Sequence, residues 1–461
     1  MTPTNMGVRD IEALVHPFTN LKRHRDTGPT ILERGQGVHL FDDRGQKYID
    51  GLAGLWCTSL GFGNEELIEA AASQMRKLPF SSMFTGKSHE PAIELAEKLK
   101  EIAPGSPSKV LFSSGGSDAN DMQVKLTWYY NNARGMPQKK KIISRMRAYH
   151  GITVASGSLT GLPPVHTDFD LPIKNVAYTS CPDFYRGAAE GETEDQFTDR
   201  MARDLEDLIK KEGPDTVAAF IAEPVMGAGG VVIPPKSYFP KINKVLAAHD
   251  VRIISDEVIC GFGRTGEWFG AQSLGFQPTS ISVAKAITSG YFPLGAITIE
   301  EPLYQAMLSE SEKIGVFGHG FTYTGHPVGC AIALKTIEIY QRERILDRIR
   351  ALAPVFAERM RRLAQHELVG NTRSIGLIGG VELVADRKAR RLFDPKQGVG
   401  AYCLNECQKL GLITRAIGDT IAVCPPLIIT EAQLNELFDM LEQAVKNTEA
   451  WVGSKSLRKP A

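Results

Sequence analysis

The chain has 461 residues, and its 53 Lys and Arg balance 53 Asp and Glu, so the formal net charge is zero. This balance argues against a nucleic-acid or anionic-membrane partner, because both require a basic surface. Hydrophobic residues make up 43% of the chain, and 44 Gly with 26 Pro are too few for a collagen-like or disordered sequence. A chain of this length is expected to form two or three domains with a substantial core.

The cysteines and the N-terminus predict the cellular compartment. The seven cysteines are scattered and include no C-x-x-C pair, so we expect reduced thiols and no metal site. The first residues are too polar for a secretory signal, and no apolar run approaches the roughly 18 residues of a membrane span. We therefore expect a soluble, cytoplasmic protein without a membrane partner.

Short apolar segments alternate with segments of helical periodicity in the middle of the chain. This pattern predicts an α/β fold in which crossover helices connect a parallel sheet. The expected strands lie at 109–112, 141–145, 217–222, 251–255, 281–284 and 294–299. Apolar residues spaced at i, i+4, i+7 and i+8 predict amphipathic helices around 201–209 and 238–246. The polar segment 181–195 is expected to be an exposed loop.

The sequence changes character after residue 330, where long helical segments at 331–340 and 345–363 precede an apolar strand at 379–384. We expect a large cofactor-binding domain at 66–329 and a C-terminal small α+β domain at 330–461. The N-terminal segment, 1–65, is expected to contribute to the small domain.

Two glycine-rich segments match parts of nucleotide-binding motifs. The segment 261–266 fits G-x-G-x-x-G after a strand, but the next residues do not begin an apolar-periodic helix. Gly86-Lys87-Ser88 ends like a phosphate-binding loop, but Ser81 stands where the motif requires its first glycine. A nucleotide-binding or non-catalytic scaffold protein built on 261–266 is therefore the less favoured alternative.

A lysine and an aspartate stand at the ends of two expected strands. Lys285 follows the strand 281–284; most lysines are solvated, but burial among apolar neighbours favours the neutral amine, which can form a Schiff base with an aldehyde. Asp256 follows the strand 251–255, at the edge where open α/β sheets bind ligands. A carboxylate there can keep a pyridine nitrogen protonated, although a helix cap or loop-ordering side chain is the alternative.

The segment 113–120 supplies a third element, between the strand 109–112 and a helix expected to run toward residue 130. Backbone N–H groups at a helix N-terminus form an anion site, which glycine leaves accessible and to which Ser117 can add a hydroxyl. An ordinary capped turn is the alternative. A lysine, a pyridine-pairing carboxylate and a phosphate site together predict pyridoxal 5'-phosphate as the cofactor.

These motifs, with Ala-Glu-Pro at 222–224, resemble those of the class III aminotransferases of fold type I. The resemblance is nearest to the omega-amino acid or amine:pyruvate transaminases and extends from about residue 16 to about residue 426. It implies a mainly parallel central sheet with crossover helices, a smaller α+β domain and pyridoxal 5'-phosphate as cofactor. It also implies that Lys285 is the Schiff-base lysine and that Asp256 pairs with the pyridinium nitrogen.

The resemblance implies further cofactor contacts and a second subunit. Gly116 and Ser117 match the family's phosphate-binding turn, and Thr322 matches its phosphate-binding threonine. Tyr149 matches the aromatic residue that stacks on the cofactor ring, and Val258 matches the residue on the opposite ring face. Glu223 matches the acidic residue near the cofactor hydroxyl. The loop 320–327, which contains that threonine, resembles one that reaches into the neighbouring subunit's site. A homodimer with shared active sites is implied, and a tetramer remains open.

The resemblance also implies a substrate pocket. Trp56, Phe84 and Phe18 resemble its aromatic walls, together with Tyr149, and Arg415 matches a mobile arginine that pairs with a substrate carboxylate. The planar fork of an arginine binds a carboxylate bidentately and can swing away for an apolar group. The alternatives are plain core packing for the aromatic residues and a surface ion pair for the arginine.

The implied activity is a ping-pong transamination with a small amine and a keto acid as partners. A primary amine or omega-amino acid donates its amino group, pyruvate accepts it, and Lys285 acts as general base and acid. Other class III reactions remain open, namely those of a taurine-type transaminase, a decarboxylating transaminase or an aminomutase. The physiological amine and the stereoselectivity also remain open.

Overall fold

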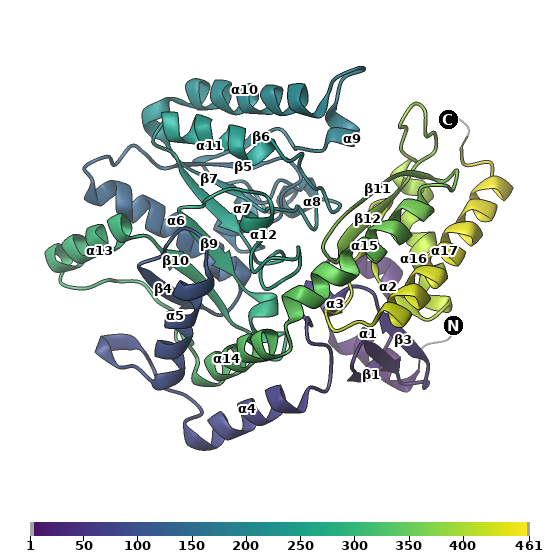
Figure 1. The fold of residues 1–461 in the computed structure, drawn as a ribbon, viewed down its shortest axis with the longest axis horizontal. Coiled ribbons are helices and arrows are strands. Elements are labelled where there is room, and N and C mark those ends of the chain that lie inside the picture. The colour runs from purple at the N-terminus through teal and green to yellow at the C-terminus, as the bar shows by residue number, and fades with distance from the viewer. Residues whose placement is uncertain (1–3, 459–461) are drawn as a thin grey trace.

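A seven-stranded sheet, in the order β4-β10-β9-β8-β7-β5-β6, forms the centre of the computed structural model, which describes residues 4–458 (Figure 1). The strands are β4 (Lys109–Ser113), β5 (Lys141–Arg145), β6 (Val176–Thr179), β7 (Val217–Ala222), β8 (Arg252–Asp256), β9 (Ser280–Val283) and β10 (Gly295–Ile299). β10 is antiparallel to β4 and β9, and the other pairs are parallel. The predicted mainly parallel sheet is confirmed, and all six expected strands are present.

Helices cover both faces of this sheet. One face carries α6 (Gly116–Ala133), α7 (Val154–Leu159), α8 (Pro163–His166) and α13 (Glu301–Ile314), and the other carries α9 (Phe184–Gly187), α10 (Glu194–Glu212), α11 (Tyr238–Ala248) and α12 (Gly270–Ser273). Successive strand residues point to opposite faces: in β7, Ile221 packs with Val124 of α6, whereas Phe220 packs with Leu205 of α10. The apolar stripes predicted around 201–209 and 238–246 are buried, as expected.

Two local predictions need correction. β6 was not predicted, because it is a short edge strand whose first three residues are only half-buried. The expected loop 181–195 contains α9, and only its second half is largely exposed.

The segment 257–269 consists mainly of turns before the four-residue helix α12, so no long helix follows the G-x-G-x-x-G match.

A second group of helices packs beside the large sheet. α14 (Pro327–Arg342) contacts α4 (Glu65–Lys77), α5 (Glu90–Ile102) and the 3-10 helix η3 (Lys285–Thr288). α15 (Ile345–Leu363) contacts α17 (Glu431–Ser454) and β11 (Val369–Ile375). The main packing partners therefore change between α14 and α15, and position 330, the predicted start of the C-terminal domain, lies within α14. The remaining 3-10 helices are η1 (Phe84–Gly86), η2 (Pro214–Thr216) and η4 (Pro395–Gln397).

Two four-stranded sheets combine the two ends of the chain. Their orders are β1-β2-β3-β13 and β11-β12-β15-β14. The additional strands are β1 (Leu32–Gln36), β2 (His39–Asp42), β3 (Lys47–Asp50), β12 (Ile378–Leu383), β13 (Leu412–Ile413), β14 (Arg415–Ile417) and β15 (Thr420–Val423). The parallel pairing of β3 with β13 joins the N-terminal segment to the C-terminal part, and Figure 1 shows the purple and yellow segments side by side. The remaining helices are α1 (Asn5–Ala13), α2 (Leu21–Thr27), α3 (Ala53–Trp56) and α16 (Val399–Lys409).

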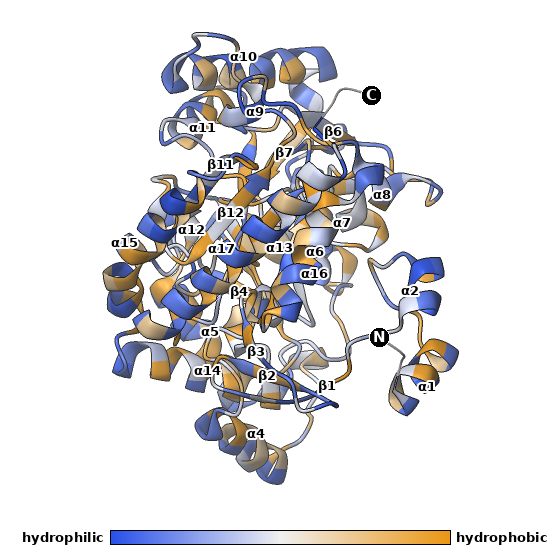
Figure 2. Cartoon of the chain, turned by 90° about the vertical axis from the view of Figure 1, so that its right-hand side faces the viewer, coloured by the Kyte–Doolittle hydropathy of each residue, from blue (hydrophilic) through white to orange (hydrophobic). Residues whose placement is uncertain are grey.

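The distribution of hydropathy agrees with this layering. Figure 2 shows hydrophobic residues along the inner strands and inward helix faces, with hydrophilic residues on the outer helices. All seven cysteines lie within the described residues and are unpaired, and five are buried. Among residues 4–458, no helix combines the length and the apolar character that crossing a membrane would require.

Candidate active site

A cavity of about 400 Å³ lies where the carboxyl ends of several central strands meet, and this is the edge of an open α/β sheet where ligands bind. Its walls also include residues from both ends of the chain. The lining residues are Phe18, Leu55, Trp56, Gly116, Ser117, Asn120, Tyr149, His150, Gly151, Leu162, Pro164, Val165, Glu223, Ala228, Asp256, Val258, Ile259, Lys285, Arg415, Ala416, Ile417 and Gly418. Ten of the twelve residues singled out from the sequence are in this set.

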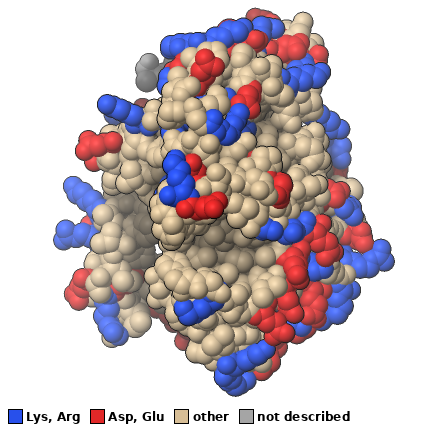
Figure 3. Space-filling model, turned by 90° about the vertical axis from the view of Figure 1, so that its left-hand side faces the viewer, with Lys and Arg blue, Asp and Glu red and all other residues tan. Residues whose placement is uncertain are grey.

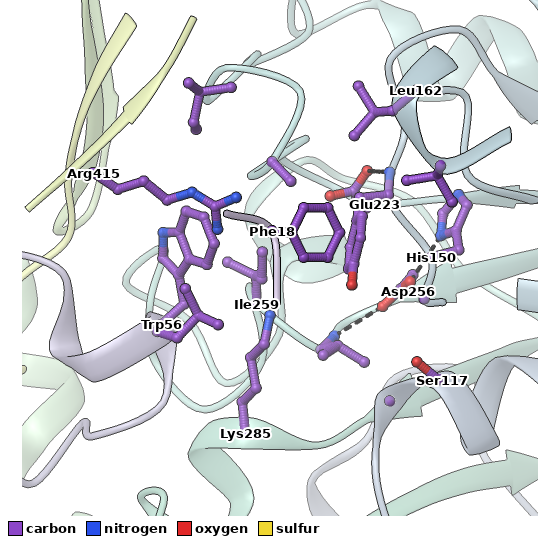
Figure 4. Close-up of a pocket in the computed structure, with 18 of the residues that line it drawn as sticks. Phe18, Trp56, Ser117, His150, Leu162, Glu223, Asp256, Ile259, Lys285 and Arg415 are labelled. Atoms are coloured by element: carbon purple, nitrogen blue, oxygen red, sulfur yellow. Dashed lines mark hydrogen bonds and ion pairs between the residues drawn. The ribbon is translucent and has the colours of Figure 1, made fainter. Parts of the chain in front are cut away.

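Lys285 extends into the cavity from the first position of η3, which a single residue separates from the end of β9 (Figure 4). Its backbone has a φ of 51°, a strained value for a residue with a side chain. Burial lowers the pKa of the Lys285 ammonium, and the nearby Asp256 carboxylate opposes this effect. A lowered pKa increases the fraction of neutral amine, the form that acts as a nucleophile or a base.

Asp256 ends β8 and is buried, with its carboxylate held by three donors. Nδ1 of His150 and Nδ2 of Asn120 each lie 2.8 Å from Oδ2, and the backbone N–H of Val258 lies 3.1 Å from Oδ1. Figure 4 shows the His150 contact as a dashed line. These bonds fix the carboxylate without an arginine or lysine ion pair among the described residues.

His150 and Asn120 were not among the predicted site residues. A signal for Asn120 exists, because it lies four residues after Gly116 and therefore on the same face of α6. His150 directly follows Tyr149, but its contact joins the loop after β5 to the end of β8. Only the order of the strands in the sheet brings this histidine to the aspartate.

The N-terminus of α6 forms one wall of the cavity. This helix has 18 residues and begins at Gly116, so its first N–H groups and its dipole favour an anion. A Cβ atom at Gly116 would lie 3.0 Å from Cγ1 of Val258, and glycine therefore permits this close approach. Ser117 Oγ accepts a hydrogen bond from the Ile152 N–H at 3.2 Å.

Glu223 and Tyr149 form the opposite side. Glu223, at the end of β7, accepts hydrogen bonds from the backbone N–H groups of Tyr149 and Gly227, both at 3.0 Å. Burial raises the pKa of Glu223 and of the Tyr149 hydroxyl. The Tyr149 ring also makes an edge contact with Phe18, with centroids 6.1 Å apart.

Trp56 and Arg415 close the cavity from the two chain ends. The Arg415 guanidinium carbon lies 5.3 Å from the Trp56 ring centroid, and Lys285 Nζ lies at the same distance. The loop around Trp56 is strained, since Ala53 and Trp56 have φ values of 48° and 59°. No salt bridge among the residues of 4–458 includes Arg415, so its charge is available to an acidic ligand.

Asp50, which the sequence analysis missed, positions this strained loop. Its carboxylate accepts hydrogen bonds from the N–H groups of Leu52 at 2.9 Å and Gly54 at 2.6 Å. Burial raises the pKa of Asp50. The residue is separated from Trp56 by only six positions, but its role depends on a loop conformation that no sequence pattern indicated.

Phe84 and Thr322 lie outside the cavity of their own chain. Both are exposed, and the Phe84 ring lies beside Gly320 at the start of the loop 320–327. The same outer region contains an edge contact between Phe80 and Tyr323, with centroids 5.9 Å apart. The structure therefore places Phe84 and Thr322 in one surface region, outside the cavity that contains Lys285.

The cavity fits pyridoxal 5'-phosphate in chemistry as well as in size. The α6 N-terminus suits a phosphate, Asp256 suits a pyridinium nitrogen, and Lys285 faces the space between them. Two buried polar atoms beside Asp256, Asn120 Oδ1 and His150 Nε2, have no hydrogen-bond partner among residues 4–458. Such orphaned groups are expected where a polar ligand completes a site.

Known proteins agree with this chemistry. The family Aminotransferase class-III matches residues 21–445. The curated gamma aminobutyrate transaminase 1, mitochondrial, of Solanum lycopersicum is 45% identical over 446 residues, which cover 96% of this chain and 86% of the relative.

Two solved structures are similar over almost the whole chain. The omega transaminase of Pseudomonas jessenii in complex with PMP is 46% identical, with a TM-score of 0.96 and coverage of 98% of this chain and 99% of that chain. A thermostable omega transaminase engineered for asymmetric synthesis of enantiopure bulky amines is also 46% identical, with a TM-score of 0.96 and coverage of 97% and 100%. Its name specifies substitutions of a tryptophan, a phenylalanine and an arginine.

Aminotransferases of this class use pyridoxal 5'-phosphate to transfer amino groups, and the chain has both their fold and a cavity that fits the cofactor. The chain is a pyridoxal-phosphate-dependent enzyme of the class III aminotransferase family.

Proposed function

We propose that the enzyme transfers the amino group of a primary amine or an omega-amino acid to pyruvate, in two half-reactions that share one pocket. The observation that carries this proposal is Arg415, a cation that lines the cavity above Trp56 without an acidic partner among the described residues. An arginine can bind the carboxylate of a keto acid bidentately. The apolar walls suit the rest of an amine donor.

The proposed roles of the other residues follow from their positions. When bound, pyridoxal phosphate supplies an aldehyde that takes up the amino group and a ring that withdraws electrons. The neutral amine of Lys285 removes a proton from the substrate carbon and later returns one. Asp256 would keep a positive charge at the ring nitrogen, and the α6 N-terminus with Ser117 would hold the phosphate. Tyr149 and Val258 would pack against the ring.

Glu223 is proposed to lie near the cofactor hydroxyl. Its two backbone N–H donors fix its carboxyl group beside Tyr149. Because burial raises the pKa of Glu223, its carboxyl group is a better hydrogen-bond partner for a phenolic oxygen than a solvated carboxylate would be. This role complements that of Asp256, which accepts three hydrogen bonds at the other side of the site.

The assignment of Trp56, Phe84 and Arg415 to the substrate pocket has support from a relative. In the engineered omega transaminase, the substituted tryptophan, phenylalanine and arginine are separated by 28 and 331 residues. Trp56, Phe84 and Arg415 have the same intervals. That protein was engineered for bulky amines, so these positions are proposed to limit donor size here too.

We further propose a homodimer in which the partner supplies Phe84 and Thr322 to each pocket. The exposed aromatic residues Phe80 and Phe84 lie next to the loop 320–327, which itself contains the exposed Tyr323. The face drawn in Figure 3 has a hollowed middle with few charged side chains and a margin with charges of both signs, as suits a self-complementary contact. A tetramer is compatible with the same contact, and a cytoplasmic location remains a prediction.

The test is a screen of amine donors with pyruvate as acceptor. We expect alanine to form in a one-to-one ratio with the carbonyl product, for donors both with and without a distal carboxylate. Decarboxylation products would favour a decarboxylating transaminase, and a rearranged amine without alanine would favour an aminomutase. Turnover restricted to aminosulfonates would favour a taurine-type enzyme.

A further inference from the structure

A cluster of one carboxylate and two imidazoles lies at the N-terminal end of the chain, apart from the residues that hold the cofactor. Asp10 belongs to α1, His24 to α2, and His16 to the connection between them. His16 Nε2 lies 2.8 Å and 3.0 Å from the two carboxylate oxygens of Asp10, and His24 Nε2 lies 3.2 Å from Oδ1. The imidazole centroids are 4.2 Å apart.

This arrangement has the composition and spacing of a transition-metal site. Ligand atoms at tetrahedral angles and 2.0 to 2.2 Å from zinc lie roughly 3.3 Å apart, and three protein ligands with one open position are common. The candidate ligand atoms of Asp10, His16 and His24 all lie within 4.8 Å of one another. Two imidazoles and a carboxylate favour zinc and similar divalent ions over magnesium or calcium.

We propose that Asp10, His16 and His24 bind one divalent transition-metal ion, of which zinc is the best chemical match, and that this ion fixes α1 against α2. The spacing of the cysteines predicted no metal site. The present cluster contains no cysteine, and its ligands at positions 10, 16 and 24 converge only after α1 and α2 fold back on each other.

The ion would stabilise a segment that has little other support. Gly7 is the only buried residue of α1 and α2, and Figure 2 shows both helices at the margin of the molecule. Thr4 Oγ1 donates a hydrogen bond to Asp43 at 2.6 Å. A metal that links residues 10 and 24 would shorten the free length of the connection between the helices and lower its conformational entropy.

The same segment carries Phe18 into the active-site cavity. Phe18 lies two residues after His16, has a φ of 50° and contacts the Tyr149 ring. Its side chain is 63% exposed, so its position depends on the turn that holds it rather than on burial. The proposed ion thereby positions one wall of the substrate pocket without touching the substrate.

The first test measures metal binding to the holoenzyme. Protein without a polyhistidine tag is treated with a chelator, dialysed and titrated with zinc chloride by calorimetry at pH 7.5. We expect one saturable site per chain. Because loss of a residue that only supports a ligand weakens metal binding roughly 10- to 100-fold, His16→Ala and His24→Ala should each weaken it by at least that factor.

His366→Ala is the matched control, since His366 also lies near two carboxylates, those of Glu442 at 3.7 Å and Glu449 at 3.8 Å, but forms no candidate metal cluster within the described part of the chain. This variant should bind zinc as the parent enzyme does. Absence of a saturable site in the parent enzyme would overturn the proposal and leave a hydrogen-bonded cluster. Equal zinc affinity in the His16→Ala and His24→Ala variants would overturn it as well, because the ion would then bind elsewhere.

The second test follows the segment itself by hydrogen exchange with mass spectrometry. Zinc should slow exchange in peptides from 5–28 of the parent enzyme and the His366→Ala variant, but not of the His16→Ala variant. Unchanged exchange in the parent enzyme at saturating zinc would contradict the role in fixing α1 against α2. Neither test measures amine turnover, so each outcome is independent of the proposed substrate.

Discussion

Lys285 is the residue whose removal should change the chemistry most directly. Its buried amine faces the cavity, and general acid–base catalysis by one positioned group contributes roughly 10²- to 10⁴-fold. Since the same amine is also proposed to bind the cofactor covalently, we expect Lys285→Ala to lower turnover by at least this factor. The measurement is alanine formed from pyruvate with a good amine donor.

Lys139→Ala provides the control for this prediction. Lys139 is also buried but lies outside the cavity and pairs with Asp250 at 3.1 Å. Its removal should lower thermal stability with little effect on turnover per folded enzyme. Substantial turnover by the Lys285→Ala variant would remove this lysine from its central role.

Arg415 should discriminate between the two half-reactions. Hydrogen bonds to charged groups contribute about 1.5–3 kcal/mol, so Arg415→Ala should lower kcat/KM for the keto acid by roughly 10- to 150-fold. A donor without a carboxylate should be affected much less. Steady-state kinetics with pyruvate and a plain aryl amine measure both values, and equal losses would contradict the proposal that one pocket serves both substrates.

The sequence was informative about residues that end predicted strands. Lys285, Asp256 and Glu223 follow apolar strands of one parallel sheet, so their convergence followed from the expected fold. His150 acts through a hydrogen bond to the Asp256 carboxylate, and Asp50 acts by accepting hydrogen bonds from loop N–H groups. Such contacts depend on loop geometry, which has no periodicity to indicate it.

Glu257 holds the connection between β8 and α12. Protonation of the Glu257 carboxylate should make the free energy of unfolding depend on pH. Glu257 is buried and accepts hydrogen bonds from Ser255 Oγ and from the N–H groups of Gly270 and Ala271. Burial raises the pKa of Glu257 to about 7 from an ordinary value of 4.5. The unfolded chain releases this proton above about pH 4.5, whereas the native state retains it up to about pH 7. The free energy of unfolding therefore falls as the pH rises from about 4.5 to 7.

We expect Glu257→Gln to remove this pH dependence from the free energy of unfolding. The amide cannot ionise, although it also presents a donor to the backbone N–H groups and should lower stability at every pH. Urea denaturation at pH 5, 6, 7 and 8 measures the slope. Glu267→Gln, which changes a half-exposed carboxylate in the same connection, should leave the slope unchanged, and a slope that persists in Glu257→Gln would contradict the prediction.

At the level of elements, burial determined what was predictable. β7 and β8 are buried at every position and were predicted within one residue of their ends. β1 and β14 are exposed or half-buried throughout, and short strands of this kind gave no apolar pattern. The N-terminal segment was expected to contribute to the C-terminal small domain, but no sequence pattern indicated the pairing of β3 with β13, which joins residues more than 360 positions apart.

The molecule as a whole should associate through the surface that contains Phe80, Phe84 and Tyr323. We expect sedimentation equilibrium to give at least twice the chain mass of 50.5 kDa. Tyr323→Asp should weaken association and lower activity together, because a buried unpaired charge is costly and each pocket would lose the partner's loop. Leu392→Asp, at a position in the C-terminal part that is 50% exposed against 59% for Tyr323, should affect neither. A fully active single chain would contradict the shared site.

The parallel pairing of β3 with β13 has a consequence for biosynthesis. The free edge of β3 cannot be covered until residues 412–413 have been translated. At a synthesis rate of roughly 5–20 residues per second, that edge waits roughly 20 to 70 s. During this interval an exposed strand edge can pair with other nascent chains, so the N-terminal segment is where we would expect chaperones to engage the polypeptide as it leaves the ribosome.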